Sequence, residues 1–199
     1  MSVVFNYFDY FNYFNHLNMT ILGIDPGTNF MGYGVIECNG SKINCLAIGI
    51  LDIHNVKDTY LKLKMIYDRV SGLAASYKPE ELAIEAQFYE KNAQSMLKLG
   101  RAQGVAIAAA VNAGMQVFEY EPRKIKLAIT GSGSASKEQV ARMLSNTIKI
   151  NEFPDKYDAT DALAAAVCHH YQKRLPIQKS GSNSWAAFIA NNPDRVKIS

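Results

Sequence analysis

Cysteine is scarce in this chain of 199 residues, and the three that are present, Cys38, Cys45 and Cys168, lie far apart without any CxxC spacing. This usage indicates neither a disulfide framework nor a zinc site. Isolated free thiols are typical of proteins in a reducing cytosol, so we expect a cytoplasmic protein.

A strong charge of either sign is also missing. The formal net charge is +3, with 20% charged and 48% hydrophobic residues. These values are typical of a soluble globular protein. A mild basic bias is compatible with a nucleic-acid partner but is weak evidence for one.

The two ends of the chain lack the patterning of a folded domain. A Tyr-Phe pair recurs every third residue at positions 7–8, 10–11 and 13–14, a period that fits neither a helix nor a strand. We interpret residues 1–18 as a disordered low-complexity leader, with Met19 as the true start, in preference to a functional aromatic arm. The segment is too short and too often interrupted by Asn and Asp for a membrane span, and no membrane partner is expected. Residues 176–199 are rich in Ser, Asn, Gly and Pro and are expected to form a tail, which leaves residues 19–175 as one domain.

The most informative stretch reads Ile-Leu-Gly-Ile-Asp-Pro-Gly-Thr at residues 21–28. An apolar run, a Pro-Gly turn and a second apolar run at residues 32–36 predict two strands joined by a tight turn. The turn leaves the carboxylate of Asp25 at the end of a buried strand. A carboxylate there lowers stability unless a cation meets it.

The rest of the chain alternates between strand and helix patterns. We expect further strands at 42–53, 81–85 and 115–120, and helices at 59–77, 92–113, 122–130, 136–148 and 158–171. Gly114 is the expected C-cap of the long Ala-rich helix, and His169 and His170 are expected to end the last helix rather than to act on a metal or a proton. Tight turns make the first three strands an antiparallel meander. The order predicts an α/β fold with a mixed five-stranded sheet, three antiparallel strands followed by parallel ones, and helices on both faces.

Four carboxylates are expected to meet at one edge of this sheet. Asp25 and Glu85 follow buried strands, and ligands of such sheets gather at strand ends. Asp158 and Asp161 share one face at the start of a helix, where capping alone would also explain them. So many like charges repel one another unless divalent cations neutralise them. Oxygen ligands suit Mg²⁺ or Mn²⁺, and a pair of such ions can hydrolyse a phosphodiester.

Five segments, in order, resemble the RuvC-type Holliday-junction resolvases over residues 20–174. The opening Gly-Ile-Asp-Pro-Gly-Thr, followed by Gly-Tyr-Gly at 32–34, could alone also fit sugar-kinase and actin-like ATPases. The five together are specific. They are residues 23–34, the run from Ala83 to Phe88 and on to Asn92, and residues 97–106, 126–143 and 158–169.

The resemblance implies an RNase H-like fold, a homodimer and two Mg²⁺ ions per active site. It implies metal-binding catalytic roles for Asp25, Glu85, Asp158 and Asp161, although some family members carry His at the position of Asp158. The implied reaction is the symmetric nicking of four-way DNA junctions in recombination and repair, with the 5′-phosphate retained. The implied partners are the RuvA and RuvB branch-migration proteins.

Three further residues are expected to touch DNA. Phe88, in a polar loop just past Glu85, is interpreted as a ring that stacks on an unpaired base rather than as a core anchor. Lys126 and Lys137 flank a Gly-Ser loop, and the resemblance places them on DNA phosphates, whereas most lysines are simply solvated. Arg123, Lys124 and Arg142 could extend the same basic stripe.

Other functions remain open at this point. A different RNase H-like nuclease would fit the same carboxylates, but the Phe88 loop and residues 131–137 argue against it. A junction-binding protein without cleavage would not need all four carboxylates, and an actin-like ATPase would need a second phosphate-binding glycine motif. Cleavage of a four-way junction, compared with a linear duplex, separates these possibilities.

Overall fold

The computed structural model describes residues 18–87, 92–148, 150, 154 and 156–174. Its centre is one five-stranded sheet with the strand order β3-β2-β1-β4-β5. β1 (Met19–Asp25), β2 (Phe30–Asn39) and β3 (Lys42–Asp52) form the antiparallel meander. β4 (Glu81–Glu85) pairs with β1 in parallel, and β5 (Gln116–Tyr120) pairs with β4 in parallel. The predicted mixed sheet is therefore confirmed.

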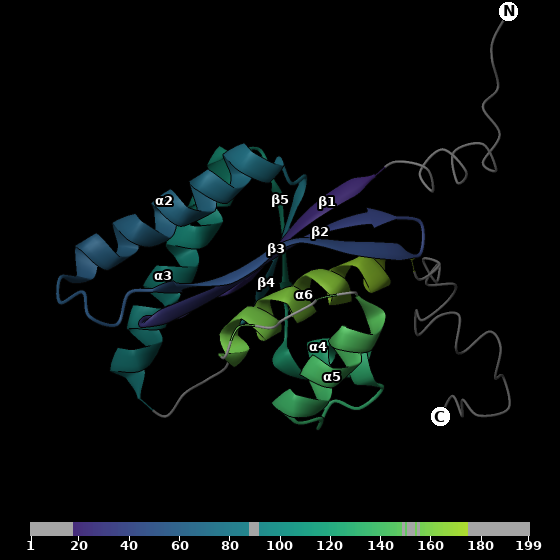
Figure 1. Cartoon of the computed structure of the whole chain (residues 1–199). Coiled ribbons are helices and arrows are strands. Elements are labelled where there is room, and N and C mark those ends of the chain that lie inside the picture. The colour runs from purple at the N-terminus through teal and green to yellow at the C-terminus, as the bar shows by residue number, and fades with distance from the viewer. Residues whose placement is uncertain (1–17, 88–91, 149, 151–153, 155, 175–199) are drawn as a thin grey trace, which may run out of the picture.

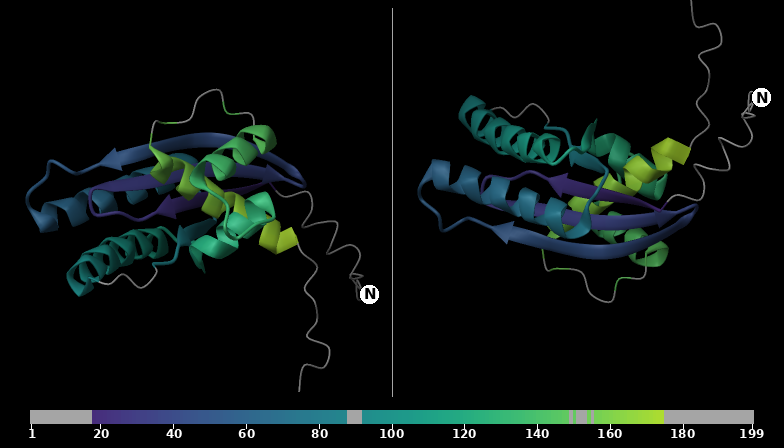
Figure 2. Two further views of the ribbon diagram at one scale, coloured as in Figure 1. Left: turned by 90° about the horizontal axis from the view of Figure 1, so that it is seen from below. Right: turned by 90° about the horizontal axis from the view of Figure 1, so that it is seen from above.

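In the described residues, five helices cover the two faces of the sheet. α2 (Thr59–Tyr77) and α3 (Ala93–Asn112) pack on one face, and α4 (Pro122–Thr130), α5 (Lys137–Thr147) and α6 (Tyr157–Arg174) pack on the other, as Figures 1 and 2 show. Each face has its own buried hydrophobic cluster. Among the described residues, no helix is long and apolar enough to cross a membrane.

Local signals explain where the helices begin and end. The side chain of Asp58 accepts hydrogen bonds from the backbone amides of the first turn of α2, and Ser136 forms a capping box with Gln139 at the start of α5. The prediction for Gly114 was wrong by one residue. Ala113 is the C-cap of α3, and Gly114 follows it with a φ of 85°, the left-handed conformation that ends many helices.

The prediction that His169 and His170 end the last helix was also wrong. α6 continues to Arg174, and both imidazoles are buried. The two ring nitrogens of His169 lie 2.6 Å from Tyr120 and Glu81, and these contacts hold the last turns of α6 against the sheet. Nε2 of His170 is buried without a hydrogen-bond partner among the described residues.

The alternation of side chains along β1 decides which of its residues meet α6. Leu22 and Ile24 point into the α2–α3 cluster, whereas Ile21 points into the cluster that contains α6. Side chains alternate between faces along a strand, so Gly23 and Asp25 share the α6 face with Ile21. The same alternation on β4 puts Glu85 on that face, because Ala83 packs in the α6 cluster.

Glycines allow α6 to lie very close to the sheet. A Cβ atom on Gly23 would collide with the carbonyl oxygen of Ala162, and one on Gly32 would collide with the carbonyl oxygen of Asp158. The α6 residues at this contact are small, with alanines at positions 162, 164, 165 and 166, all fully buried. The close approach places the start of α6 against the end of β1 and the beginning of β2.

Candidate active site

Asp25 and Glu85 lie at the carboxyl ends of two neighbouring parallel strands. β1 and β4 pair with Ile24 opposite Ile84, so the next residue of each strand is an acidic one on the α6 face. Both side chains are partly buried. The sheet alone therefore brings two carboxylates together, as the sequence predicts.

Asp158 and Asp161 come from the first turns of α6. Gly32, which pairs with Asp25 across the β1–β2 hairpin, is the residue that lies against the backbone of Asp158. The missing side chain at Gly32 is thus what lets the helix approach the end of β1. Both aspartates are partly exposed and lie at the edge of the sheet where β1 and β4 end.

The pKa values of Asp25 and Glu85 show that the four carboxylates interact electrostatically. Burial, followed by the charges of Glu85, Asp161 and Asp158, raises the pKa of Asp25 well above its ordinary value. Burial and the charge of Asp161 raise the pKa of Glu85 to about 7, although two lysines act against the shift. Two partly buried carboxylates with raised pKa values, side by side, are typical of a functional site that binds a cation.

Lys137 is the cation in direct contact with this cluster. Its Nζ atom lies 2.5 Å from Oδ2 of Asp161, whose side chain is 16% exposed. Burial lowers the pKa of Lys137, but the hydrogen bond and charge of Asp161, with the charges of Asp25 and Asp158, outweigh it and leave the pKa raised. Lys126 is the second lysine whose charge lowers the pKa of Glu85.

The four carboxylates lie at the same edge of the sheet, but they are not arranged as a complete metal site. In the described ranges, no three acidic, histidine or cysteine side chains stand close enough together to hold a metal ion as they are placed. Asp161, one of the four, is engaged by the ammonium of Lys137. The donor set consists of carboxylate oxygens, which suits hard divalent cations.

The remaining residues that the sequence predicts to touch DNA are Phe88, Arg123, Lys124 and Arg142. Phe88 lies outside the described residues. The ammonium of Lys124 lies over the ring of Tyr120, 5.2 Å from its centroid, and the side chain of Arg123 lies next to Gly133. Arg142 is exposed on α5.

A buried polar network at the opposite end of α6 was not anticipated. Nε2 of His169 donates to Oε2 of Glu81 at 2.6 Å, and Nδ1 of His169 lies 2.6 Å from the hydroxyl of Tyr120. The ammonium of Lys173 lies 2.5 Å from the other oxygen of Glu81. Burial raises the pKa of Glu81, but the bonds from His169 and Lys173 outweigh it and leave the pKa lowered.

This network connects α6 to Glu81, the first residue of β4, and to Tyr120, the last residue of β5. Glu81 and Glu85 lie four residues apart on one face of β4, while His169 lies eleven residues after Asp158, close to three helical turns. The helix is thus pinned at one end by His169 while its other end carries the acidic pair. No local pattern in the sequence marks this contact, because it depends on how α6 lies against a strand 88 residues away.

Comparison with known proteins identifies the family. The family model described as crossover junction endodeoxyribonuclease RuvC matches residues 21–169. The chain belongs to the RuvC family. A RuvC relative from Bacteroides fragilis, named a crossover junction endodeoxyribonuclease, is 54% identical over 179 residues, which cover 89% of this chain and 95% of the relative.

Solved structures agree with the RuvC assignment. The structure of T. thermophilus RuvC in complex with a Holliday junction substrate superposes with a TM-score of 0.74 at 32% identity, covering 78% of this chain and 95% of the other. The yeast mitochondrial Holliday junction resolvase Ydc2 shares only 14% identity, and its TM-score of 0.60 over 79% of this chain supports the fold alone. The RNase H-like fold that the sequence resemblance implies is therefore confirmed.

Proposed function

We propose that this protein is a Mg²⁺-dependent endonuclease that resolves four-way DNA junctions by paired symmetric nicks in homologous recombination and DNA repair. The observation that carries the proposal is the meeting of Asp25 and Glu85 with the acidic start of α6 at one edge of a RuvC-family sheet. T. thermophilus RuvC, which is 32% identical to this chain and shares its fold, has been solved in complex with a Holliday junction substrate.

The catalytic residues in this proposal are Asp25, Glu85, Asp158 and Asp161. Their oxygens would hold two Mg²⁺ ions, or Mn²⁺ in their place. Such ions, when bound, activate a water for attack on the scissile phosphorus and stabilise the leaving oxygen. The raised pKa values of Asp25 and Glu85 support this fit, because burial and the neighbouring carboxylates make both charges unfavourable, and a bound cation would offset that cost. Cleavage that leaves the phosphate on the 5′ end follows from the family resemblance.

Lys137 and Lys126 are proposed to bind DNA phosphates beside the cut. In the structure Lys137 neutralises Asp161. Divalent cations at the carboxylates would take over that role and free the ammonium, which is 51% exposed at its side chain, for the DNA backbone. Phe88 is proposed to stack on an unpaired base near the junction centre.

A homodimer is part of the proposal, because two equivalent sites suit a substrate with two-fold symmetry. One face of α3 supports it. Leu97 and Val111 are 64% and 58% exposed, and between them Gly100 and Gly104 have no atom within 4 Å of the place where a Cβ would lie. These exposed apolar side chains and the two glycines would allow a second copy to approach this α3 face closely.

The remaining parts of the proposal rest on the family. RuvA and RuvB are the proposed partners, and the cytoplasm is the proposed compartment. Within the chain, residues 19–175 are proposed as the nuclease domain, with residues 1–18 as a leader and 176–199 as a tail.

The test is cleavage of a synthetic four-way junction and of a linear duplex with the same arm sequences. We expect paired nicks at opposed positions in the junction with Mg²⁺, none with EDTA, and little cleavage of the duplex. Equal cleavage of both substrates would point to a less selective nuclease. Binding of the junction without cleavage at any Mg²⁺ concentration would point to a non-cleaving junction-binding protein.

A further inference from the structure

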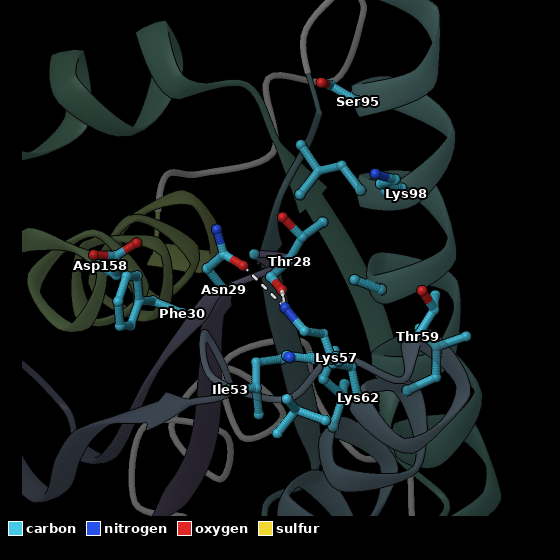
Figure 3. A pocket seen from close by; sticks show the side chains of 16 residues that line it. Thr28, Asn29, Phe30, Ile53, Lys57, Thr59, Lys62, Ser95, Lys98 and Asp158 are labelled. Atoms are coloured by element: carbon cyan, nitrogen blue, oxygen red, sulfur yellow. Dashed lines mark hydrogen bonds between the residues drawn. The ribbon is translucent and has the colours of Figure 1, made fainter.

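A pocket of about 590 Å³ lies beside the carboxylate centre, behind the turn that joins β1 to β2. Residues 27–30 of the turn form one wall, and the first turns of α2 and α3 form the others. Figure 3 shows Asp158 at one side of the pocket and Lys98 at the other. The pocket therefore shares Asp158 with the carboxylate centre.

The pocket is positively charged away from Asp158. Lys57 from the loop before α2, Lys62 from α2 and Lys98 from α3 all line it. Within the part of the chain that the structure describes, none of these three lysines forms an ion pair with a carboxylate. Asp58, the acidic neighbour of Lys57, is engaged in capping α2 through hydrogen bonds from two backbone amides. Three cations without a carboxylate partner favour an anionic ligand.

Lys62 is held in place rather than free in solvent. Its Nζ atom donates to the backbone oxygen of Thr28 and to Oδ1 of Asn29, both at 2.9 Å, as Figure 3 shows. These partners are neutral, so the positive charge is not cancelled. An ammonium has three donors, and two bonds leave one of them for a ligand in the pocket.

The same two bonds connect the pocket to the catalytic turn. Thr28 and Asn29 follow Asp25 by three and four residues, and the backbone oxygen of Asn29 also accepts a bond of 2.9 Å from the amide of Ile53. Lys62 thus supports the turn that positions Asp25. A ligand that binds Lys62 therefore acts on the geometry of that turn.

We propose that this pocket binds a backbone phosphate of the DNA strand that is cut, next to the scissile phosphate. The inference rests on the proposed junction-cleaving function. A strand that places one phosphate at the carboxylates passes Asp158, which borders both sites, and brings a neighbouring phosphate to Lys57, Lys62 and Lys98. Lys62 is then a positioning residue, since it joins that phosphate to the turn behind Asp25.

The experiment measures junction binding by the full chain in EDTA over a range of salt concentrations. The variants are Lys57→Met, Lys62→Met and Lys98→Met, with Lys64→Met as the control. Lys64 lies on α2 as Lys62 does, but it is exposed and pairs with Asp68. Each pocket variant is expected to bind more weakly and to lower the log–log salt slope by about one unit. Lys64→Met is expected to keep the wild-type slope.

A second readout separates Lys62 from its neighbours. At saturating junction and Mg²⁺, Lys62→Met is expected to cleave more slowly than Lys57→Met and Lys98→Met, because it alone loosens the Asp25 turn. Unchanged melting temperatures would show that the three variants are folded. Equal turnover in all three would overturn the positioning role of Lys62.

The remaining outcomes distinguish this inference from the proposed function. If the wild-type protein cleaves junctions and all three pocket variants keep its salt slope, the phosphate site is overturned. Inorganic phosphate, titrated without DNA, identifies the source. Suppose that Lys57→Met loses the binding of inorganic phosphate while the salt slopes of junction binding stay unchanged. That result would indicate a site for free phosphate and would also overturn the proposal. A wild-type protein that neither binds nor cleaves junctions would overturn the proposed function itself.

Discussion

At the scale of single residues, the acidic centre combines two opposing demands. In our proposal Asp25 and Glu85 bind cations in their ionised form, but burial and mutual repulsion make ionisation costly without cations. The ammonium of Lys137, which pairs with Asp161, offsets part of the negative charge. Stability and metal binding are therefore coupled at this site, and two substitutions test the coupling.

Asp25→Asn is expected to abolish cleavage while junction binding remains. The amide keeps the shape of the side chain but is a poor ligand, and losing one ligand should cost several kcal/mol of transition-state stabilisation, about a thousandfold or more in rate. Nicking assays with Mg²⁺ and gel shifts in EDTA measure the two effects separately. Asp68→Asn, at an exposed ion pair on α2, is the control and should behave as wild type. Turnover near the wild-type rate in Asp25→Asn would contradict the catalytic assignment.

Glu85→Gln is expected to stabilise the metal-free protein at pH 8. The pKa of Glu85 is about 7 in the folded state against an ordinary value of 4.5. The folded state thus binds the proton more tightly, and the wild type loses stability as the pH rises from about 4.5 to 7. Gln carries no charge, so the variant escapes a loss of roughly 1–3 kcal/mol.

Urea unfolding in EDTA at pH 4.5 and pH 8 measures this difference. The two proteins should be similar at pH 4.5, and the variant should be the more stable one at pH 8. Adding Mg²⁺ at pH 8 should reduce the advantage, because only the wild type gains from the cation. A variant that is less stable than the wild type at pH 8 in EDTA would show that Glu85 is not strained by its charge.

At the scale of elements, the contact between α6 and the β1–β2 hairpin builds the site. Gly32 pairs with Asp25 and lies against the backbone of Asp158. The site therefore depends on how close a helix comes to a strand, which in turn depends on the absence of one methyl group.

Gly32→Ala is expected to destabilise the fold and to lower cleavage together. The added Cβ meets the backbone of Asp158, which cannot rotate away as a side chain would, so the cost should reach at least the 1–3 kcal/mol, roughly, of an overpacked core. Gly72→Ala is the matched control. Gly72 lies in α2 with no atom within 4 Å of the new methyl group, and alanine there should stabilise by about 0.5–1 kcal/mol. Thermal melting and nicking assays compare the two, and equal melting temperatures would contradict the close packing of α6.

The sequence predicted the elements well because their signals are local. The bounds of α2, β4 and α4 follow directly from apolar periodicity, Pro and Gly. Asp25 and Glu85 could be placed together because both end buried strands. The Glu81–His169 contact depends on the register of a helix against a strand 88 residues away, and the three pocket lysines come from separate segments. No local pattern marks such contacts, so only the folded chain reveals them.

At the scale of the whole molecule, the α3 face decides the oligomeric state in our proposal. Leu97→Asp is expected to yield monomers at concentrations where the wild type is dimeric, because it places a charge on an exposed apolar face. Leu61→Asp is the control, since Leu61 is 48% exposed at the start of α2, where an acidic side chain is tolerated. Analytical ultracentrifugation measures both variants. A dimeric Leu97→Asp would assign the contact to another surface.

Removal of residues 1–18 is expected to leave melting temperature, oligomeric state and junction cleavage nearly unchanged. Their period of three residues cannot form an amphipathic element, and β1 begins at Met19. Comparison of the shortened and full chains under identical conditions measures the effect. A clear fall in stability or the loss of the dimer would assign a structural role to the leader.

The position of α6 in the chain also sets the order of events during synthesis. All five strands leave the ribosome before residues 157–174, and until then β1 and β2 lack the cover that α6 gives them. Only two of the four carboxylates exist at that stage. At about 5–20 residues per second, α6 follows β1 by several seconds or more, and during that interval the nascent chain has no centre that could cut DNA. Nuclease activity is thus delayed until α6 has been synthesised, because the acidic start of α6 is part of the proposed site.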